Sequence, residues 1–127
     1  MLYNAKCHCG AVQAEVEAPE HIDCYRCNCS MCSLTAYLHL IVPKSKFKLL
    51  HGQDSIESYS FNTGVAKHTF CKRCGIKVFY TPRSNPDGYS VNVRCLHPQP
   101  RSIGIENFDG NNWEESAHKL AGLSKEN

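Results

Sequence analysis

Seven of the nine cysteines in this chain fall into three tight clusters, and no other feature of the sequence predicts chemistry so directly. The clusters are Cys7 and Cys9, then Cys27, Cys29 and Cys32, then Cys71 and Cys74. Cysteines two or three positions apart can turn their sulfurs toward one point, as a tetrahedral Zn²⁺ requires. The same spacing meets the geometry of a disulfide only with difficulty, and nine is an odd number of cysteines. We therefore predict that the clusters bind metal.

The two outer pairs predict one closed metal site, with the ligands Cys7, Cys9, Cys71 and Cys74. Four thiolates fill the tetrahedral coordination of a structural Zn²⁺, which would join the start of the chain to its middle. Such a zinc contributes on the order of 10 kcal/mol to folding. Lys6, Lys72 and Arg73 stand beside the ligands and could offset their excess negative charge. The alternative is that Cys7 and Cys9 are ordinary buried cysteines, but paired spacing seldom arises from packing alone.

The middle cluster predicts a different kind of site, because Cys27, Cys29 and Cys32 supply only three sulfurs. Three protein ligands and an open fourth position are typical of a catalytic zinc site. A small thiol is the natural occupant of that position, because a thiol that coordinates a metal is deprotonated. We therefore predict a second Zn²⁺, making two per chain.

Cys24 leaves an alternative for the middle cluster. With Cys24 included, the spacing becomes Cys-x₂-Cys-x-Cys-x₂-Cys, and four thiolates could close a second structural site. Residues 22–26 look extended, however, and all four ligands would have to come from nine residues. The open site is the favoured hypothesis, and whether Cys24 joins the cluster decides between an open and a closed site.

The other polar candidates carry weaker signals. Cys95 stands alone after an expected strand and is interpreted as a small buried hydrophobe. His39 and His68 lie in expected strands, where core or surface roles are more common than metal ligation. His97 could carry a proton if it reached a pocket. Three basic residues could anchor an anionic substrate, or they could simply be solvated side chains. They are Arg26, Lys44 and Arg94.

Short patterns of period two predict the strands that must position these residues. The ranges are 11–18, 37–42, 55–61, 65–70, 76–80 and 89–93. We expect an all-β fold of roughly eight to ten short strands in small sheets, with each cysteine cluster in a turn between strands. Gly10 and Gly75 directly follow two clusters and would supply the positive φ that such turns require. A short C-terminal helix is expected to start near 109–112, with Trp113, Ala117 and Leu120 on one face.

Length and charge narrow the possible functions. The chain has 127 residues, so we expect residues 1–127 to form a single zinc-binding domain. The net charge is only +2 and well mixed, so no nucleic-acid partner is expected. The N-terminal residues contain no apolar signal-peptide core, and no stretch approaches about 18 apolar residues. We therefore expect no membrane contact and a cytoplasmic or nuclear location, where thiols stay reduced.

The motifs, taken in order, resemble a known family. They are Lys-Cys-His-Cys-Gly at 6–10, Cys-Asn-Cys-Ser-Met-Cys at 27–32 and Phe-Cys-Lys-Arg-Cys-Gly at 70–75. Further matches are Leu-Ile-Val-Pro at 40–43, His-Thr-Phe at 68–70, Cys-Leu at 95–96 and Asp-Gly-Asn-Asn-Trp-Glu at 109–114. Together they resemble the glutathione-dependent formaldehyde-activating enzymes, and within that family the centromere protein V branch. The resemblance extends from about Tyr3 to about Leu120.

The resemblance implies a β-tent-like fold with small sheets held by zinc. It implies a structural zinc on Cys7, Cys9, Cys71 and Cys74, and a catalytic-type zinc on Cys27, Cys29 and Cys32. The implied activity is that of a carbon–sulfur lyase acting on adducts of glutathione, or a similar small thiol, with an aldehyde such as formaldehyde. The alternative is a non-catalytic zinc module that binds chromatin or cytoskeletal proteins. The identities of the thiol and aldehyde, and the oligomeric state, are left open by the sequence.

Overall fold

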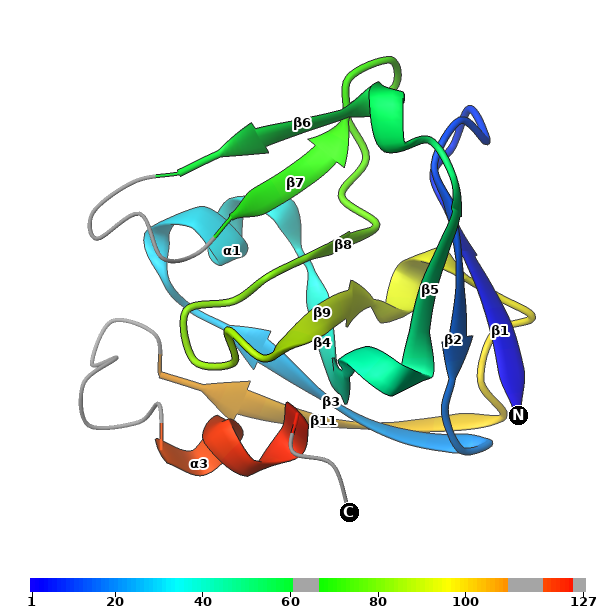
Figure 1. The fold of residues 1–127 in the computed structure, drawn as a ribbon. Helices are drawn as coiled ribbons and strands as arrows, with labels where there is room; N and C mark the ends of the chain where they lie inside the picture. The colour runs from blue at the N-terminus through cyan, green and yellow to red at the C-terminus, as the bar shows by residue number, and fades with distance from the viewer. Residues whose placement is uncertain (61–66, 110–117, 125–127) are drawn as a thin grey trace.

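Short strands in three sheets are the main regular elements of the structure, a computed structural model that describes residues 1–60, 67–109 and 118–124 (Figure 1). One sheet contains, in spatial order, β10 (Leu96–His97), β1 (Leu2–Lys6), β2 (Gln13–Glu17) and β5 (Phe47–His51). A second contains β11 (Ser102–Phe108), β3 (His21–Cys27), β4 (Leu38–Pro43), β9 (Gly88–Asn92) and β8 (Phe79–Tyr80). The third pairs β6 (Ile56–Tyr59) with β7 (His68–Cys71). The predicted all-β class is confirmed.

Helices are few and short in the described residues. They are α1 (Ser30–Thr35), α3 (His118–Ala121) and the 3₁₀ turns η1 (Lys44–Lys46), η2 (Gln53–Ser55), η3 (Val93–Cys95) and η5 (Gly122–Ser124). The C-terminal helix was expected to start near 109–112, but residues 110–117 lie outside the described part of the chain, so only α3 bears on that prediction. α1 was not predicted. The middle cysteine cluster lies between two strands as expected, but in a strand end and a helical turn instead of a simple turn.

The predicted strand ranges omit β1, β5, β10 and β11, and β11 differs most from a locally formed strand. It pairs with β3 in parallel, in continuous register from Ser102 opposite His21 to Phe108 opposite Cys27. The other strand pairs are antiparallel. A parallel partner cannot be reached by a hairpin, so no local turn signal marks β11 as a member of this sheet.

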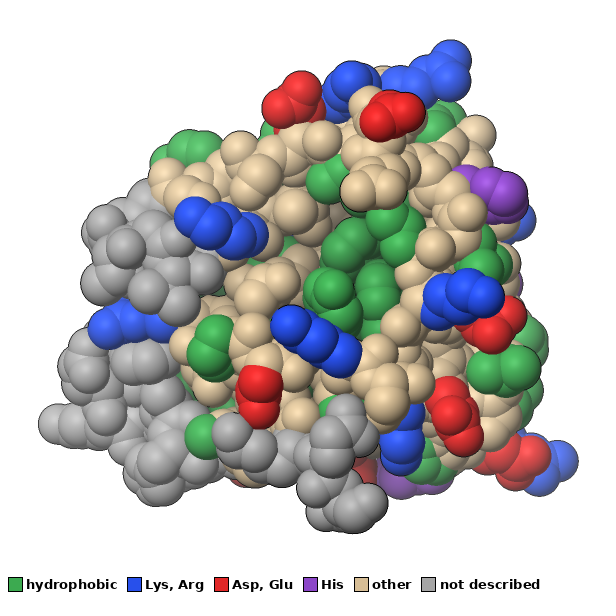
Figure 2. All heavy atoms as spheres, in the orientation of Figure 1, with side chains coloured by type: hydrophobic (Ala, Val, Ile, Leu, Met, Phe, Trp, Pro, Cys, Tyr) green, Lys and Arg blue, Asp and Glu red, His purple; other side chains and the backbone are tan. Residues whose placement is uncertain are grey.

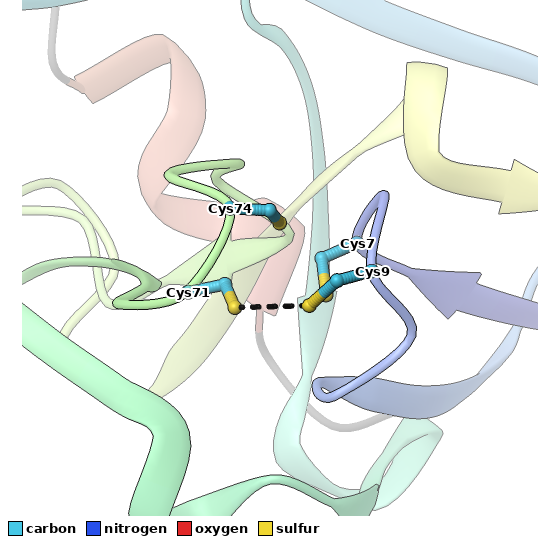
Figure 3. A group of neighbouring side chains, drawn as sticks. All are labelled: Cys7, Cys9, Cys71 and Cys74. Atoms are coloured by element: carbon cyan, nitrogen blue, oxygen red, sulfur yellow. Dashed lines mark hydrogen bonds between the residues drawn. The ribbon is translucent and has the colours of Figure 1, made fainter.

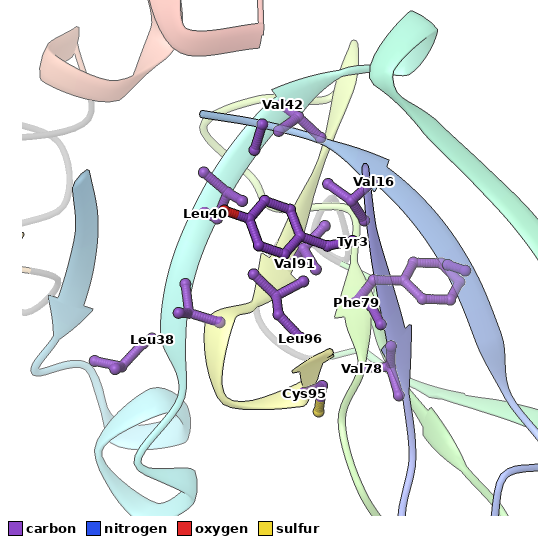
Figure 4. Packing of buried hydrophobic residues seen from close by; sticks show 14 of the residues in the cluster. Tyr3, Val16, Leu38, Leu40, Val42, Val78, Phe79, Val91, Cys95 and Leu96 are labelled. Atoms are coloured by element: carbon purple, nitrogen blue, oxygen red, sulfur yellow. The ribbon is translucent and has the colours of Figure 1, made fainter. Parts of the chain in front are cut away.

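The five-stranded sheet has two faces of different composition. Side chains of β4 alternate, so that Leu38, Leu40 and Val42 enter the main hydrophobic core (Figure 4). His39 and Ile41 point to the opposite face, and the whole strand is buried. We call this second side the polar face, because it also carries much of the site described below.

The main core fills the space between the four- and five-stranded sheets. Tyr3 of β1 lies in it and donates a hydrogen bond from its hydroxyl to the carbonyl oxygen of Pro19 at 2.6 Å. At its edge, Phe47 of β5 stacks on Tyr89 of β9, with ring centroids 4.4 Å apart, and contacts Phe79 of β8. Figure 2 shows hydrophobic side chains in a recess between β5 and β8. Aromatic packing therefore joins the two sheets at this edge.

Gly52, between β5 and β6, should tolerate no side chain. Its φ is +100°, and a Cβ there would lie 2.7 Å from the Cα of Val12, in the turn that follows Cys9. We expect Gly52→Ala to lower the free energy of unfolding by about 2 kcal/mol or more, from backbone strain plus overpacking. Gly122→Ala is the matched control, since its Cβ would meet no atom within 4 Å. Equal unfolding free energies for the two variants in denaturant titrations would contradict this packing.

Candidate metal centres

Four thiols from distant parts of the chain meet in one place, which we call the four-thiol group (Figure 3). Its members are Cys7, Cys9, Cys71 and Cys74, and their sulfurs all lie within 4.8 Å of one another. Cys9 Sγ lies 3.7 Å from both Cys7 Sγ and Cys71 Sγ. The first pair sits in the turn between β1 and β2, and the second lies at the end of β7 and in the turn that follows. This arrangement could hold a metal ion that joins the two turns.

The backbone of both turns supports the sulfurs. Gly10 and Gly75 have φ of +81° and +79°, as predicted from the sequence. The Val12 N–H donates to Cys7 Sγ at 3.3 Å. Burial raises the pKa of Cys74, but backbone hydrogen bonds from Cys9 and Ile76 outweigh it and bring the pKa to about 6. The Ala11 N–H lowers the pKa of Cys9, but burial and hydrogen bonds with the neighbouring thiols raise it to about 11. Cys74 therefore becomes a thiolate, the form that binds a metal, before Cys9 does.

The middle cluster forms a second group, the three-thiol group, made of Cys27, Cys29 and Cys32. Their sulfurs also lie within 4.8 Å of one another. Cys27 ends β3, and Cys29 is the N-cap of α1, where its sulfur accepts the Cys32 N–H at 3.3 Å. Hydrogen bonds with Cys27 and Cys32 lower the pKa of Cys29, whereas hydrogen bonds with Cys27 and Cys29 raise the pKa of Cys32. The three thiols therefore titrate as one unit that first releases the proton of Cys29.

Cys24 lies apart from this group. Side chains alternate along β3, so Cys24 faces the main core with Ile22, whereas Cys27 faces the opposite side. The Cys24 thiol is buried and donates to the Gly104 carbonyl oxygen of β11 at 3.5 Å. Among the described residues, the group therefore has three sulfurs. This geometry favours the open site over a closed four-thiolate site.

A cleft of about 650 Å³ opens beside the three-thiol group, where β3 and β11 end. Its wall includes Cys27 and Cys32 together with the rings of Tyr37 and Phe108. The polar lining residues include Arg26, Asn28, Ser33, Asn107 and Asp109. Arg26 Nε donates to Asn107 Oδ1 at 3.1 Å, and Asn28 Nδ2 donates to Asp109 Oδ1 at 3.2 Å. Two of the three thiols thus border a space large enough for a small molecule.

Five buried side chains pack together on and around the polar face, and we call them the inner polar cluster. They are Tyr37, His39, His68, Lys77 and Tyr80. The Tyr80 ring is central, with the His68 ring stacked on it at 4.7 Å and the Tyr37 ring edge-on at 5.5 Å. Lys77 Nζ lies 5.0 Å from the Tyr80 ring centroid and 5.3 Å from that of Tyr37, and donates to His68 Nδ1 at 3.2 Å. The hydroxyls of Ser90 and Tyr80 lie 2.9 Å and 3.3 Å from His39 Nδ1.

The inner polar cluster holds one cation beside two neutral imidazoles. Burial, and then the charge of Lys77, lower the pKa of His39 to about 3 and that of His68 to about 4. Burial lowers the pKa of Lys77 too, but the charges of Cys32 and Cys29 oppose this shift. Tyr37 of the inner polar cluster also lines the cleft with Cys27 and Cys32, so the cluster lies beside the three-thiol group.

The remaining candidates from the sequence lie elsewhere or play other roles. Cys95 is buried, as expected, and neither His39 nor His68 joins a metal-capable group within the described residues. His97 is exposed on β10, in the sheet that does not carry the three-thiol group. Arg94 donates from Nε to the Ala36 carbonyl oxygen at 3.2 Å, outside the cleft lining. Lys44 lies in η1, also outside that lining.

Lys77, Tyr37 and Tyr80 were missed by sequence reasoning. Their spacing matches no motif, and their proximity depends on β4, β8 and the segment after Cys74 coming together. An isolated lysine in an otherwise apolar stretch, Gly-Ile-Lys-Val-Phe at 75–79, was the one available signal.

Comparison with known proteins identifies the family. The family model for the glutathione-dependent formaldehyde-activating enzyme matches residues 2–108, and the chain belongs to this family. A Halomonas elongata protein, provisionally named as such an enzyme, is 30% identical over 92 residues, which span 65% of this chain and 59% of that protein. A crystal structure of a Rhodobacter sphaeroides protein is similar, with a TM-score of 0.70 and 35% identity over 81% of this chain and 99% of that one. The centromere protein V branch stays a prediction. No described helix is long and apolar enough to span a membrane.

Loss of one ligand should expose the role of the four-thiol group. Cys9 is exposed, so Cys9→Ser removes little packing and mainly removes a metal ligand. We expect this variant to lose one metal per chain and, with it, stabilisation on the order of 10 kcal/mol, comparable with a whole domain's stability. His8→Ser, at the exposed neighbouring position, should keep wild-type metal content and melting temperature. Native mass spectrometry measures the metal content, and thermal unfolding measures the melting temperature. A Cys9→Ser protein as stable as the wild type would contradict a structural role.

His39 should make the protein sensitive to acid. The folded state holds its pKa near 3, whereas the unfolded chain binds a proton at the ordinary value of 6.5. The unfolded state therefore binds more protons below pH 6.5, and His39 reduces stability as the pH falls from 6.5 toward 3. In urea titrations across this range, His39→Gln should flatten the pH slope by up to about 1.4 kcal/mol per pH unit. An unchanged slope would show that His39 is protonated in the folded protein.

Proposed function

We propose that this protein is a zinc-dependent enzyme of the carbon–sulfur lyase type, acting on adducts of glutathione, or a similar small thiol, with an aldehyde such as formaldehyde. The observation that carries the proposal is the convergence of three sulfurs, without a fourth among the described residues, beside a cleft of about 650 Å³. In this proposal residues 1–127 form one zinc-binding domain.

Both thiol groups have donor sets suited to zinc. Soft thiolate ligands in a closed tetrahedral set are typical of structural Zn²⁺, and three ligands with an open fourth position are typical of catalytic Zn²⁺. We assign a structural zinc to Cys7, Cys9, Cys71 and Cys74, and a second zinc to Cys27, Cys29 and Cys32. Zinc bound to the three-thiol group would supply the Lewis acidity that keeps a substrate thiol deprotonated at neutral pH.

The chain's own residues would bind and orient the thiol. Arg26 offers a cation for a substrate carboxylate, and Asn28 and Asn107 offer amide groups for a peptide-like backbone. The rings of Tyr37 and Phe108 line the same cleft and would exclude water from the reacting sulfur. These features match glutathione, a small thiol with carboxylates and peptide bonds, better than a simple alkyl thiol.

The proposed reaction balances without a redox partner. In the forward direction the thiolate sulfur attacks the aldehyde carbon, a C–S bond forms, and the carbonyl π electrons move to oxygen. The resulting alkoxide takes the proton that the thiol released, and the product is an S-hydroxyalkyl thioether. The reverse reaction breaks the C–S bond and returns thiol and aldehyde.

Replacing one sulfur of the three-thiol group tests this function. We expect wild-type protein to accelerate exchange between glutathione, formaldehyde and their adduct above the spontaneous rate, as measured by NMR exchange spectroscopy. Cys27→Ser should return the rate to the spontaneous value with a folded chain, because it removes one of three ligands beside the cleft.

Cys24→Ser is the matched control, since it alters the same strand on the opposite face and should keep the activity. Unfolding of Cys27→Ser would indicate a structural role for its group. Wild-type protein that gives no acceleration, with both metals bound, would instead favour the non-catalytic binding module.

A further inference from the structure

Lys77 is a buried cation that lacks a carboxylate partner in the described part of the chain. Only 8% of the residue is exposed, and lysine is rarely buried to this extent unless it is paired. Its ammonium donates to His68 Nδ1 at 3.2 Å and lies over the faces of Tyr37 and Tyr80. These contacts solvate the ammonium but do not neutralise it. Its counter-charge must therefore come from another group.

The three-thiol group is the candidate source of that counter-charge. Burial lowers the pKa of Lys77, and the two opposing influences come from Cys32 and Cys29. Tyr37 connects the two places, because its ring lies 5.3 Å from Lys77 Nζ and also lines the cleft with Cys27 and Cys32. Both neighbouring imidazoles are neutral near pH 7, so Lys77 is the cation of the inner polar cluster.

Charge at the three-thiol group depends on what occupies its fourth position. Three thiolates and one divalent cation carry a net charge of −1, which a neutral ligand leaves unchanged and a thiolate ligand makes −2. A fixed buried cation stabilises the site of charge −2 more than the site of charge −1, because electrostatic attraction is strong where water is excluded. Two buried side chains hold the Lys77 backbone, because its carbonyl oxygen accepts hydrogen bonds from Asn92 Nδ2 at 3.0 Å and Cys95 Sγ at 3.7 Å.

We propose that Lys77 is a positioning residue that makes the three-thiol group select an anionic ligand, the thiolate of a small thiol, over neutral ligands. The inference rests on the proposed function for the identity of the ligand as a thiol. Lys77 is not required to touch the substrate. Its ammonium acts through the thiolates and through the low-dielectric surroundings of Tyr37 and Tyr80.

Ligand binding to the cobalt-substituted protein tests the proposal without relying on turnover. The probes are 2-mercaptoethanol, which has a thiol but no carboxylate, and imidazole, which binds metals as a neutral ligand. Dissociation constants come from the change in the cobalt absorption spectrum on titration. The variants are Lys77→Met, which keeps an unbranched apolar stem, Lys77→Arg, which keeps the charge, and Lys72→Met, which removes an exposed charge in the same segment.

We expect Lys77→Met to weaken 2-mercaptoethanol binding about tenfold or more, since a buried charge near the site is lost. Imidazole binding should change less than about twofold, because a neutral ligand adds no charge for Lys77 to balance. Lys77→Arg should recover most of the thiol affinity, and Lys72→Met should bind both probes as the wild type does. Each variant must first bind two cobalt ions per chain.

Three results would overturn the proposal. They are equal thiol affinity in wild type and Lys77→Met, a parallel loss of thiol and imidazole binding, and loss of the second cobalt from both Lys77→Met and Lys77→Arg. The last two would assign Lys77 a structural role. Failure of the proposed function is distinguishable, because wild-type protein would then show Lys77-dependent thiol binding but no acceleration of adduct exchange.

Discussion

Adjacent side chains of a β-strand leave on opposite faces, and in the five-stranded sheet this constraint separates packing from chemistry. On β4, Leu40 enters the main core while His39 enters the inner polar cluster. On β3, Cys24 enters the core while Cys27 joins the three-thiol group. A single-residue slip of either strand would exchange the two sets, burying polar groups in the core and emptying the site. The central sheet therefore has one face that stabilises the fold and one that holds the reactive groups.

One stretch of chain connects the four-thiol group to the inner polar cluster. It begins at Cys71 and Cys74 in the four-thiol group, carries the Lys77 ammonium into the inner polar cluster, and ends at Tyr80 on β8. A metal in the four-thiol group would thus do more than join two turns. It would also fix the backbone from which the buried cation reaches toward the three-thiol group, so that structural stability and the electrostatics of the second site depend on each other.

The sequence predicted several features that have local signals, although it missed β1 and β5, which lie next to β2 in one sheet. Paired cysteines, the positive φ of Gly10 and Gly75, and the alternation that buries Val12, Ala14 and Val16 were all visible in short windows. β11 was not, because a parallel partner requires a distant strand. α1 was not, because it is six residues long and its N-cap is a cysteine in place of the usual serine, threonine or aspartate. The surroundings of Lys77 depend on tertiary packing, and its one local signal, a lysine within an apolar stretch, does not show which residues it meets.

The central claim is that one metal site is closed by protein and the other is open to a small thiol. Zinc-edge X-ray absorption of the purified protein with two zinc ions per chain tests it most directly, since it counts sulfur neighbours. Four ligands in one site and three in the other predict an average of about 3.5 sulfurs per zinc, rising to about 4 when glutathione is added. An average of about 4 before any thiol is added would contradict the open site, as would an average that glutathione leaves unchanged.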